Sequence, residues 1–200
     1  MKEKFHITGL FYESNKYKFR KTLNIKKNES KMKTPDLMVV MMNPGKSRPL
    51  NGIDNNNLEA EAIPDNTQNK IMEVMLNCGF EFARILNLSD VRETSSGNFY
   101  QLIPLLEKEN IAHSIFDKRR KTDFDQYFIK GVKTIFAWGV DNSLNELARK
   151  AVNSIGNENC FGIKKNGTQY AYYHPLPPNY HKQREWVQKI TEQIKTTPNN

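Results

Sequence analysis

The sequence predicts an α/β fold: a three-layer α/β/α sandwich with a mainly parallel central sheet. The wholly apolar run at residues 37–42 has the length of a strand that is buried on both faces. After it, strand-like segments alternate with segments of helical periodicity, a pattern typical of parallel strands linked by helices. We expect residues 1–33 to form a small N-terminal β hairpin and residues 34–200 to form a single α/β domain.

The basic, loosely alternating residues 1–33 predict the hairpin. Residues 48–66 carry almost no large apolar side chain and predict a long loop. Asp65 or Thr67 can cap the helix that follows, and Gly79 can end it. Its apolar side chains recur at i, i+3, i+4 and i+7: Ile71, Val74, Met75 and Cys78.

A strand is expected at 82–88 and a helix at 99–107. A short helix near Asp123 and a strand at 134–138 follow. The next helix, opened by Asp141, has a continuous apolar stripe: Leu144, Leu147, Ala148, Ala151, Val152 and Ile155. A hairpin turn at 166–167 and a final amphipathic helix complete the chain, with these inward residues: Trp186, Val187, Ile190 and Ile194.

Composition narrows the function classes. Thirty Lys and Arg against 22 Asp and Glu give a net charge of +8, which suits a polyanionic partner or serves solubility alone. The longest apolar run is too short for a bilayer, and the Lys-rich start lacks a signal-peptide core, so we expect a cytoplasmic protein. Cys78 and Cys160 have no metal spacing, and no His-x₃₋₅-His pair occurs. We therefore expect a monomer with no metal and no cofactor.

Three polar segments follow predicted strands, and we expect them to converge at one sheet edge: residues 43–47, 87–94 and 174–179. Asn43 is either a turn residue or an amide that orients a water or a substrate carbonyl. His174 either packs locally or is held by the Pro-rich turn for electrostatic catalysis. Asn87 either reads a base edge or ties two loops together.

Several other chemistries are disfavoured. Gly45-Lys46-Ser47 resembles the end of a phosphate-binding loop, but the position of its first glycine holds Val40. Neither cysteine has a nucleophilic setting, and no Gly-x-Ser-x-Gly elbow occurs. We interpret His6, His113 and His181 as surface residues. One basic run either contacts phosphates or forms a solvated loop: Lys118, Arg119, Arg120 and Lys121.

Taken together, these motifs resemble a bacterial family catalogued as domain of unknown function 1643. The resemblance spans roughly residues 38–178. It rests on short motifs in the family's order: Asn43-Pro44, Asp65-Asn66-Thr67, Asn87-Leu88, Arg92-Glu93-Thr94, Ala137-Trp138-Gly139, Asn166-Gly167 and His174-Pro175-Leu176.

A more distant resemblance is to the uracil-DNA glycosylase superfamily, nearest its mismatch-specific uracil and thymine branch. It implies that family's fold and metal-free hydrolysis of an N-glycosidic bond, with Asn43 positioning water and His174 steadying the departing base. It further implies substrate contacts from these residues: Pro44, Gly45, Asn87, Arg92, Trp138 and Leu176. Nucleic-acid contacts would come from the basic run and from these residues: Lys46, Ser47, Asn179 and Tyr180.

The expected function is therefore a DNA glycosylase-like hydrolase that acts on a damaged, mismatched or modified base flipped out of DNA. Base excision repair, or defence against phage DNA with altered bases, would be its setting. The alternative is a non-catalytic module that binds nucleic acid or a nucleotide on the same fold. A free nucleotide or small molecule also stays open as the substrate, because Leu176 replaces a DNA-gripping Ser of the superfamily and Pro178 occupies its wedge position.

Overall fold

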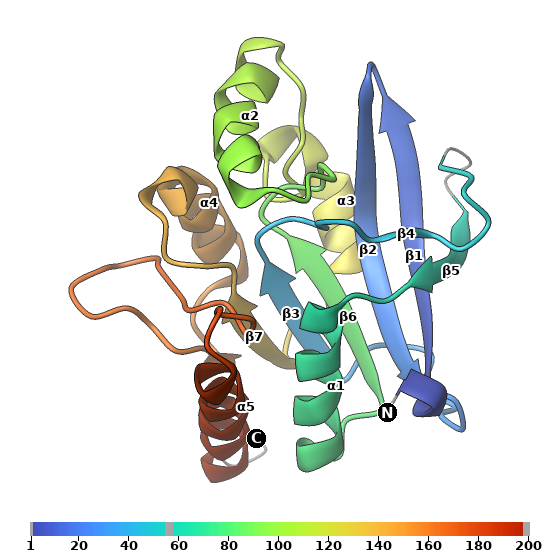
Figure 1. The fold of residues 1–200 in the computed structure, drawn as a ribbon, viewed down its shortest axis with the longest axis vertical. Helices are drawn as coiled ribbons and strands as arrows, with labels where there is room; N and C mark the ends of the chain where they lie inside the picture. The colour runs from blue at the N-terminus through green and yellow to red at the C-terminus, as the bar shows by residue number, and fades with distance from the viewer. Residues whose placement is uncertain (1, 55–57, 198–200) are drawn as a thin grey trace.

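The computed structural model describes residues 2–54 and 58–197, which form one eight-stranded sheet with helices on both faces (Figure 1). The strand order is β4-β5-β1-β2-β6-β3-β7-β8. The strands are β1 (Phe5–Ser14), β2 (Tyr17–Lys27), β3 (Leu37–Met41), β4 (Arg48–Pro49), β5 (Glu59–Ile63), β6 (Phe82–Asn87), β7 (Lys133–Ala137) and β8 (Cys160–Phe161).

The expected mainly parallel three-layer sandwich, and with it the glycosylase-like fold, is wrong. The sheet is mixed: four of the seven strand pairs found in the described residues are antiparallel, and only β6, β3, β7 and β8 run parallel to one another. The N-terminal hairpin is not a small appendage, because its second strand pairs with β6 in the middle of the sheet. Figure 1 shows its two long strands in blue.

The reason lies in the polar residues of β2. Leu23 and Ile25 face the core, as their apolar character predicts. The polar residues Arg20, Thr22 and Asn24 alternate with apolar ones in the sequence and predict solvent exposure, yet all three are buried, and the register shift at Lys21 turns Arg20 to the face of Leu23. A strand with such alternation normally indicates a half-exposed hairpin. The sequence pattern therefore does not reveal that β2 is a central strand, whose polar side chains are buried inside the protein.

Two hydrophobic cores lie on the two faces of the sheet. One forms against α1 (Asn66–Cys78) and α5 (Tyr180–Thr196). The other forms against α2 (Ser96–Lys108), α3 (Lys121–Tyr127) and α4 (Asn145–Ile155). Three short 3₁₀ turns complete the described elements: Lys2–Lys4, Lys118–Arg120 and Asn142–Leu144.

The predicted helix boundaries are largely confirmed. Asp65 caps α1 by accepting hydrogen bonds from the next turn, and Gly79 ends the helix in the left-handed conformation, at φ +81°. Asp141 caps the turn that leads into α4, and Gly156 follows the last residue of that helix. The carboxylate and glycine signals were strong here because each satisfies backbone groups that a helix end leaves unpaired.

Two local expectations are corrected. The segment 48–66 is not one long loop, because β4 and β5 pair within it and β5 adds to the edge of β1. His113 is not a surface residue: it is 3% exposed, and its Nδ1 lies 2.8 Å from Ser89 Oγ. Burial lowers the pKa of His113 to about 4. The polar neighbours of His113 in sequence suggested exposure, whereas the chain folds this residue against Ser89 and Asp90.

Candidate functional site

Three parallel strands end at one level of the sheet. Met41 of β3 is in register with Asn87 of β6 and with Ala137 of β7. From β3 the chain must pass β6, β2, β1 and β5 to reach β4 at the far edge, so residues 42–47 cross the sheet from the carboxyl end of β3 (Figure 1). Ligands of parallel sheets bind at the carboxyl ends of strands. The candidate residues that follow these strands therefore share one edge.

Asn43 is clamped by the loop that follows β6. Its Nδ2 donates to the Glu93 carbonyl at 2.7 Å and to the Val91 carbonyl at 3.4 Å. Both hydrogens of the amide are thereby used, and Oδ1 accepts no hydrogen bond from any described residue. Since Asn43 is only half-buried, its carbonyl oxygen is held in a fixed direction as a free acceptor.

Asp65 contributes a carboxylate beside this turn. Its Oδ1 accepts hydrogen bonds from Thr67 N at 2.8 Å and Gln68 N at 3.1 Å. Its Oδ2 receives none from the residues that the structure describes. A Cβ at Gly45, where φ is +60°, would lie 4.0 Å from Oδ2, so the oxygen sits against the 43–45 turn. The sequence analysis assigned Asp65 to capping alone. The cap uses only Oδ1, which leaves the second carboxylate oxygen available for a ligand, and the sequence analysis did not consider this.

His174 reaches the same edge through the chain after β8. Gly139 N, just beyond β7, donates to the Tyr172 carbonyl at 2.8 Å. Trp186 Nε1 of α5 donates to the Tyr173 carbonyl at 2.9 Å. Leu176 N donates to His174 Nδ1 at 3.2 Å, so the neutral ring carries its proton on Nε2. Two hydrogen bonds therefore hold the backbone that leads to His174, and a third holds its ring.

Burial lowers the pKa of His174 to about 4, and the Asp65 carboxylate acts in the opposite direction. The ring is therefore neutral at pH 7 and can donate one hydrogen bond from Nε2. The Asp65 carboxylate lies against Gly45 and also acts on the pKa of His174, so it is near both of the segments that the sequence analysis expected to meet.

Asn87 and Arg20 lie behind this edge. Asn87 is fully buried, and its Oδ1 accepts a hydrogen bond from Arg20 Nη2 at 3.4 Å. Arg20 is only 2% exposed, and burial lowers its pKa to about 10. Sequence reasoning missed Arg20, because it stands in the polar face of β2 that predicted an exposed hairpin.

Three other predicted substrate contacts, Arg92, Pro44 and Trp138, pack against or bond to other groups of the protein. Arg92 Nη1 donates to Asp54 at 2.5 Å, and its guanidinium lies over the Phe11 ring. Pro44 is buried. The Trp138 indole is 1% exposed and donates to the Tyr170 carbonyl at 2.7 Å, so the structure places it in the hydrophobic core.

The predicted nucleic-acid contacts are scattered. Lys46 is exposed directly after Gly45, whereas the neighbouring Ser47 is buried. In the basic run, Lys118 and Lys121 are exposed, and Lys121 pairs with Asp125.

The two arginines of that run have partners within the protein. Arg119 binds Asp117, and Arg120 turns inward to Asp90 at 2.5 Å. Burial raises the pKa of Asp90 to about 6, although Arg120 opposes this change. Arg120 therefore balances a buried carboxylate.

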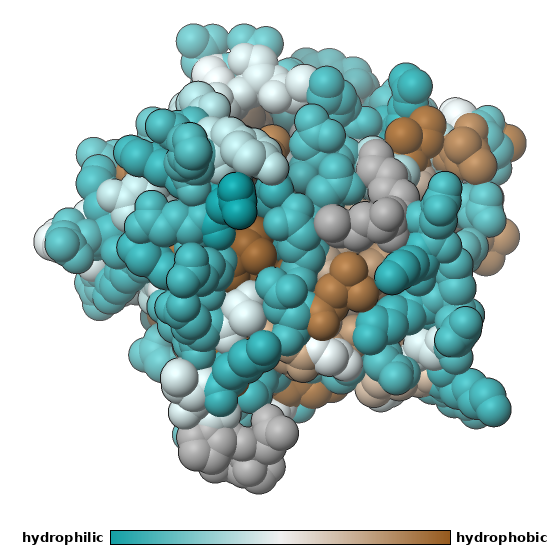
Figure 2. Space-filling view, turned by 60° about the horizontal axis from the view of Figure 1, so that its bottom comes forward, coloured by the Kyte–Doolittle hydropathy of each residue, from teal (hydrophilic) through white to brown (hydrophobic). Residues whose placement is uncertain are grey.

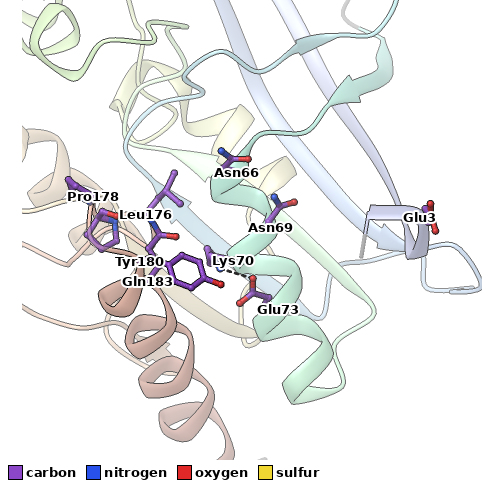
Figure 3. Close-up of a pocket in the computed structure, with 10 residues that line it drawn as sticks. Glu3, Asn66, Asn69, Lys70, Glu73, Leu176, Pro178, Tyr180 and Gln183 are labelled. Atoms are coloured by element: carbon purple, nitrogen blue, oxygen red, sulfur yellow. Dashed lines mark hydrogen bonds and ion pairs between the residues drawn. The ribbon is translucent and has the colours of Figure 1, made fainter.

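A groove of about 840 Å³ runs beside the cluster, between α1 and the start of α5 (Figure 3). Leu176 and Tyr180 line one side, and Asn69 and Lys70 line the other. Leu176 connects the groove to His174 through its backbone hydrogen bond. Asn179 caps α5 by accepting from His181 N at 2.9 Å, so this predicted nucleic-acid contact has a local role in the fold.

Within residues 2–54 and 58–197, no group of three or more His, Cys, Asp or Glu side chains is placed to hold a metal ion. No helix in the same ranges combines the length and the hydrophobicity needed to cross a membrane. Figure 2 shows a largely hydrophilic face on which the hydrophobic residues form small, separate patches.

Comparison with known proteins gives one match. The family model described as a protein of unknown function, DUF1643, matches residues 17–176. That range begins with β2 and ends just after His174, so it includes all the residues described at the sheet edge: Arg20, Asn43, Asp65, Asn87 and His174. Neither the curated proteins nor the solved structures contain a significant match.

Proposed function

The chain belongs to the DUF1643 family, whose description names no activity, and we propose that it hydrolyses the N-glycosidic bond between a base and its sugar, in DNA or in a nucleotide. The observation that carries this proposal is a clamped amide acceptor at Asn43 with the Asp65 carboxylate oxygen beside the same turn, a carboxylate that also acts on the neutral imidazole of His174. The distant similarity to the uracil-DNA glycosylase superfamily enters the proposal through the site motifs alone and not through the fold.

Asn43 would position the attacking water. A water bound to Asn43 Oδ1 donates one hydrogen bond and keeps a lone pair for the anomeric carbon. The hydrogen bond from Nδ2 to the Glu93 carbonyl supports this role, because it prevents the amide from rotating away. A water that is already oriented before the reaction lowers the entropic part of the activation barrier.

Asp65 would serve the sugar. As the bond to the base breaks, the sugar develops positive oxocarbenium character, which a nearby carboxylate stabilises. Once water has added, the same carboxylate accepts the water's second proton. Its Oδ2 is suited to this because the helix cap occupies only Oδ1.

His174 would serve the leaving base. The base departs with the bonding electron pair as an anion, and a neutral imidazole donates a hydrogen bond to its oxygen from Nε2. The hydrogen bond from Leu176 N to Nδ1 supports this assignment, because it fixes the tautomer.

The test is release of the base from a panel of oligonucleotides and nucleotides that carry damaged or modified bases. Asn43→Ala and His174→Ala should lower the rate by at least about tenfold each while the melting temperature stays within a few degrees. Asn98→Ala and His181→Ala are matched controls, since both residues are exposed on helices. Base release that is unchanged in both site variants would refute the proposal.

DNA is the partner that we propose for this activity, which would place the protein in the cytoplasm. The net charge of +8 and the exposed Lys46 beside the edge support it. If the chain retains DNA in a salt-dependent manner but releases no base from any substrate, the binding-module alternative holds instead.

A further inference from the structure

Arg20 is a buried cation with no counter-ion among the described residues. Within that part of the chain its one side-chain hydrogen bond is the 3.4 Å bond from Nη2 to Asn87 Oδ1, and Nε and Nη1 are buried without a partner there. Among the described residues, no carboxylate lies within ion-pair distance of the guanidinium, although Asp65 and Asp90 act on it from farther away. A buried guanidinium is usually paired, because desolvating it is costly.

Asn87 adds another donor at the same place. Its side chain is fully buried, and Nδ2 has no hydrogen-bond partner. Arg20 fixes the orientation of this amide, because the opposite orientation would set an NH₂ group against the guanidinium, donor facing donor. The pair therefore presents three unpartnered nitrogen atoms, and each of them donates.

A group of hydrogen-bond donors with no acceptor among them favours a ligand that only accepts hydrogen bonds. A water molecule there could accept two hydrogen bonds, but its own hydrogens would find no acceptor on this pair. An oxyanion accepts from every side and neutralises the buried charge as well. Phosphate oxygens share this chemistry with the exocyclic oxygen of a base that has become anionic.

The donors also lie at the proposed reaction centre. Asn87 ends β6 in register with Met41, two residues before Asn43. The Asp65 carboxylate that acts on His174 also acts on Arg20. A ligand that contacts Asn87 at the strand end is thus close to the residues proposed to hydrolyse the glycosidic bond.

We propose that Arg20 and Asn87 bind an oxyanion of the substrate, so that the protein acts on a nucleotide or base that presents a negatively charged oxygen to the sheet edge. This inference rests on the proposed function, whose substrate it narrows. Because the donor atoms are closed off from solvent, binding requires a local opening of the surrounding loops. We therefore expect slow association that depends little on salt.

The experiment measures binding without catalysis. Inorganic phosphate, a nucleoside monophosphate, the matching nucleoside and an anionic free base, barbiturate, are titrated into the full chain. Thermal shift and the ¹H–¹⁵N resonance of Arg20 Nε are the readouts. We expect the oxyanion ligands to move that resonance and to raise the melting temperature, and the neutral nucleoside to do neither. A response to the monophosphate and phosphate identifies a phosphate site, whereas a response to barbiturate identifies a base-anion site.

Arg20→Lys and Asn87→Leu should each weaken binding at least tenfold. Arg84→Lys is the matched control, because Arg84 also points from a sheet strand but has partners, the Asn24 side chain and the Tyr127 carbonyl. If none of the oxyanions shifts the resonance, the inference is overturned. This measurement uses the unmodified chain, so it does not depend on whether a variant folds. Base release that persists without oxyanion binding leaves the proposed function standing, whereas oxyanion binding without base release leaves only this inference.

Discussion

The second oxygen of Asp65 gives the sharpest test of the site, because one side chain performs two separable tasks. Oδ1 caps α1 through Thr67 N and Gln68 N, and Oδ2 faces the turn at Gly45. Asp65→Asn keeps an oxygen that caps equally well and removes the charge. Asp65→Ala removes both. Comparing the two variants therefore separates the helix cap from the chemistry.

The expected magnitudes follow from these contacts. Loss of the cap in Asp65→Ala should cost about 1 kcal/mol, which for a chain of this size lowers the melting temperature by roughly 2–4 °C. Asp65→Asn should stay within about 0.5 kcal/mol of the unmodified protein, since asparagine is as good a cap as aspartate. Both variants should lose about 10²–10⁴ in the rate of base release, because both lack the carboxylate.

The assays are thermal melting, single-turnover base release, and NMR titration of His174. The Asp65 carboxylate raises the pKa of His174 against the effect of burial. Both variants should therefore shift this pKa further down. Base release by Asp65→Asn within threefold of the unmodified rate would refute the catalytic role. Equal stability of the alanine and asparagine variants would show that the cap contributes nothing.

Three further outcomes are expected. Trp138→Phe should lower stability by about 1–3 kcal/mol and leave the choice of substrate unchanged, because the indole is buried and bonded to the Tyr170 carbonyl; urea unfolding and the base panel check this. Acidification from pH 7 to 4.5 should remove about 2 kcal/mol through His113, because its pKa of about 4 in the folded chain lies below the ordinary 6.5 and the unfolded chain takes up the proton first. Asp90, with its pKa raised to about 6, opposes this loss, whereas His174, whose pKa burial also lowers to about 4, adds to it, so a His113→Gln variant should show a shallower pH dependence of the unfolding midpoint. Lys46→Ala should reduce the salt slope of DNA binding by about one unit, and an unchanged slope would place the phosphate contact elsewhere.

Local sequence signals located most helices and the buried parallel strands. The capping carboxylate at Asp65 and the glycine at position 79 mark the two ends of α1. The apolar run after residue 36 became β3, buried along its whole length. These signals work at short range, because a cap or an apolar stripe satisfies groups within one or two turns of the chain.

No comparable local signal in the sequence indicated which strands pair with each other in the sheet. The polar alternation of β2 is the same whether the strand lies at a solvent edge or beside β6, and only the folded chain buries Arg20, Thr22 and Asn24. Strand pairing is decided by contacts between residues far apart in sequence, which local propensity does not encode. The prediction of a mainly parallel sheet failed for this reason.

By itself, the sequence determined which residues end the parallel strands, and so which polar groups, Asn43 and Asn87 among them, reach the sheet edge. The tertiary structure alone decided what accompanies them there: the free oxygen of Asp65, and the buried guanidinium of Arg20 from a strand that seemed remote. The physical reason is that periodicity and capping act within a few residues, whereas the burial of a charge depends on everything that packs around it.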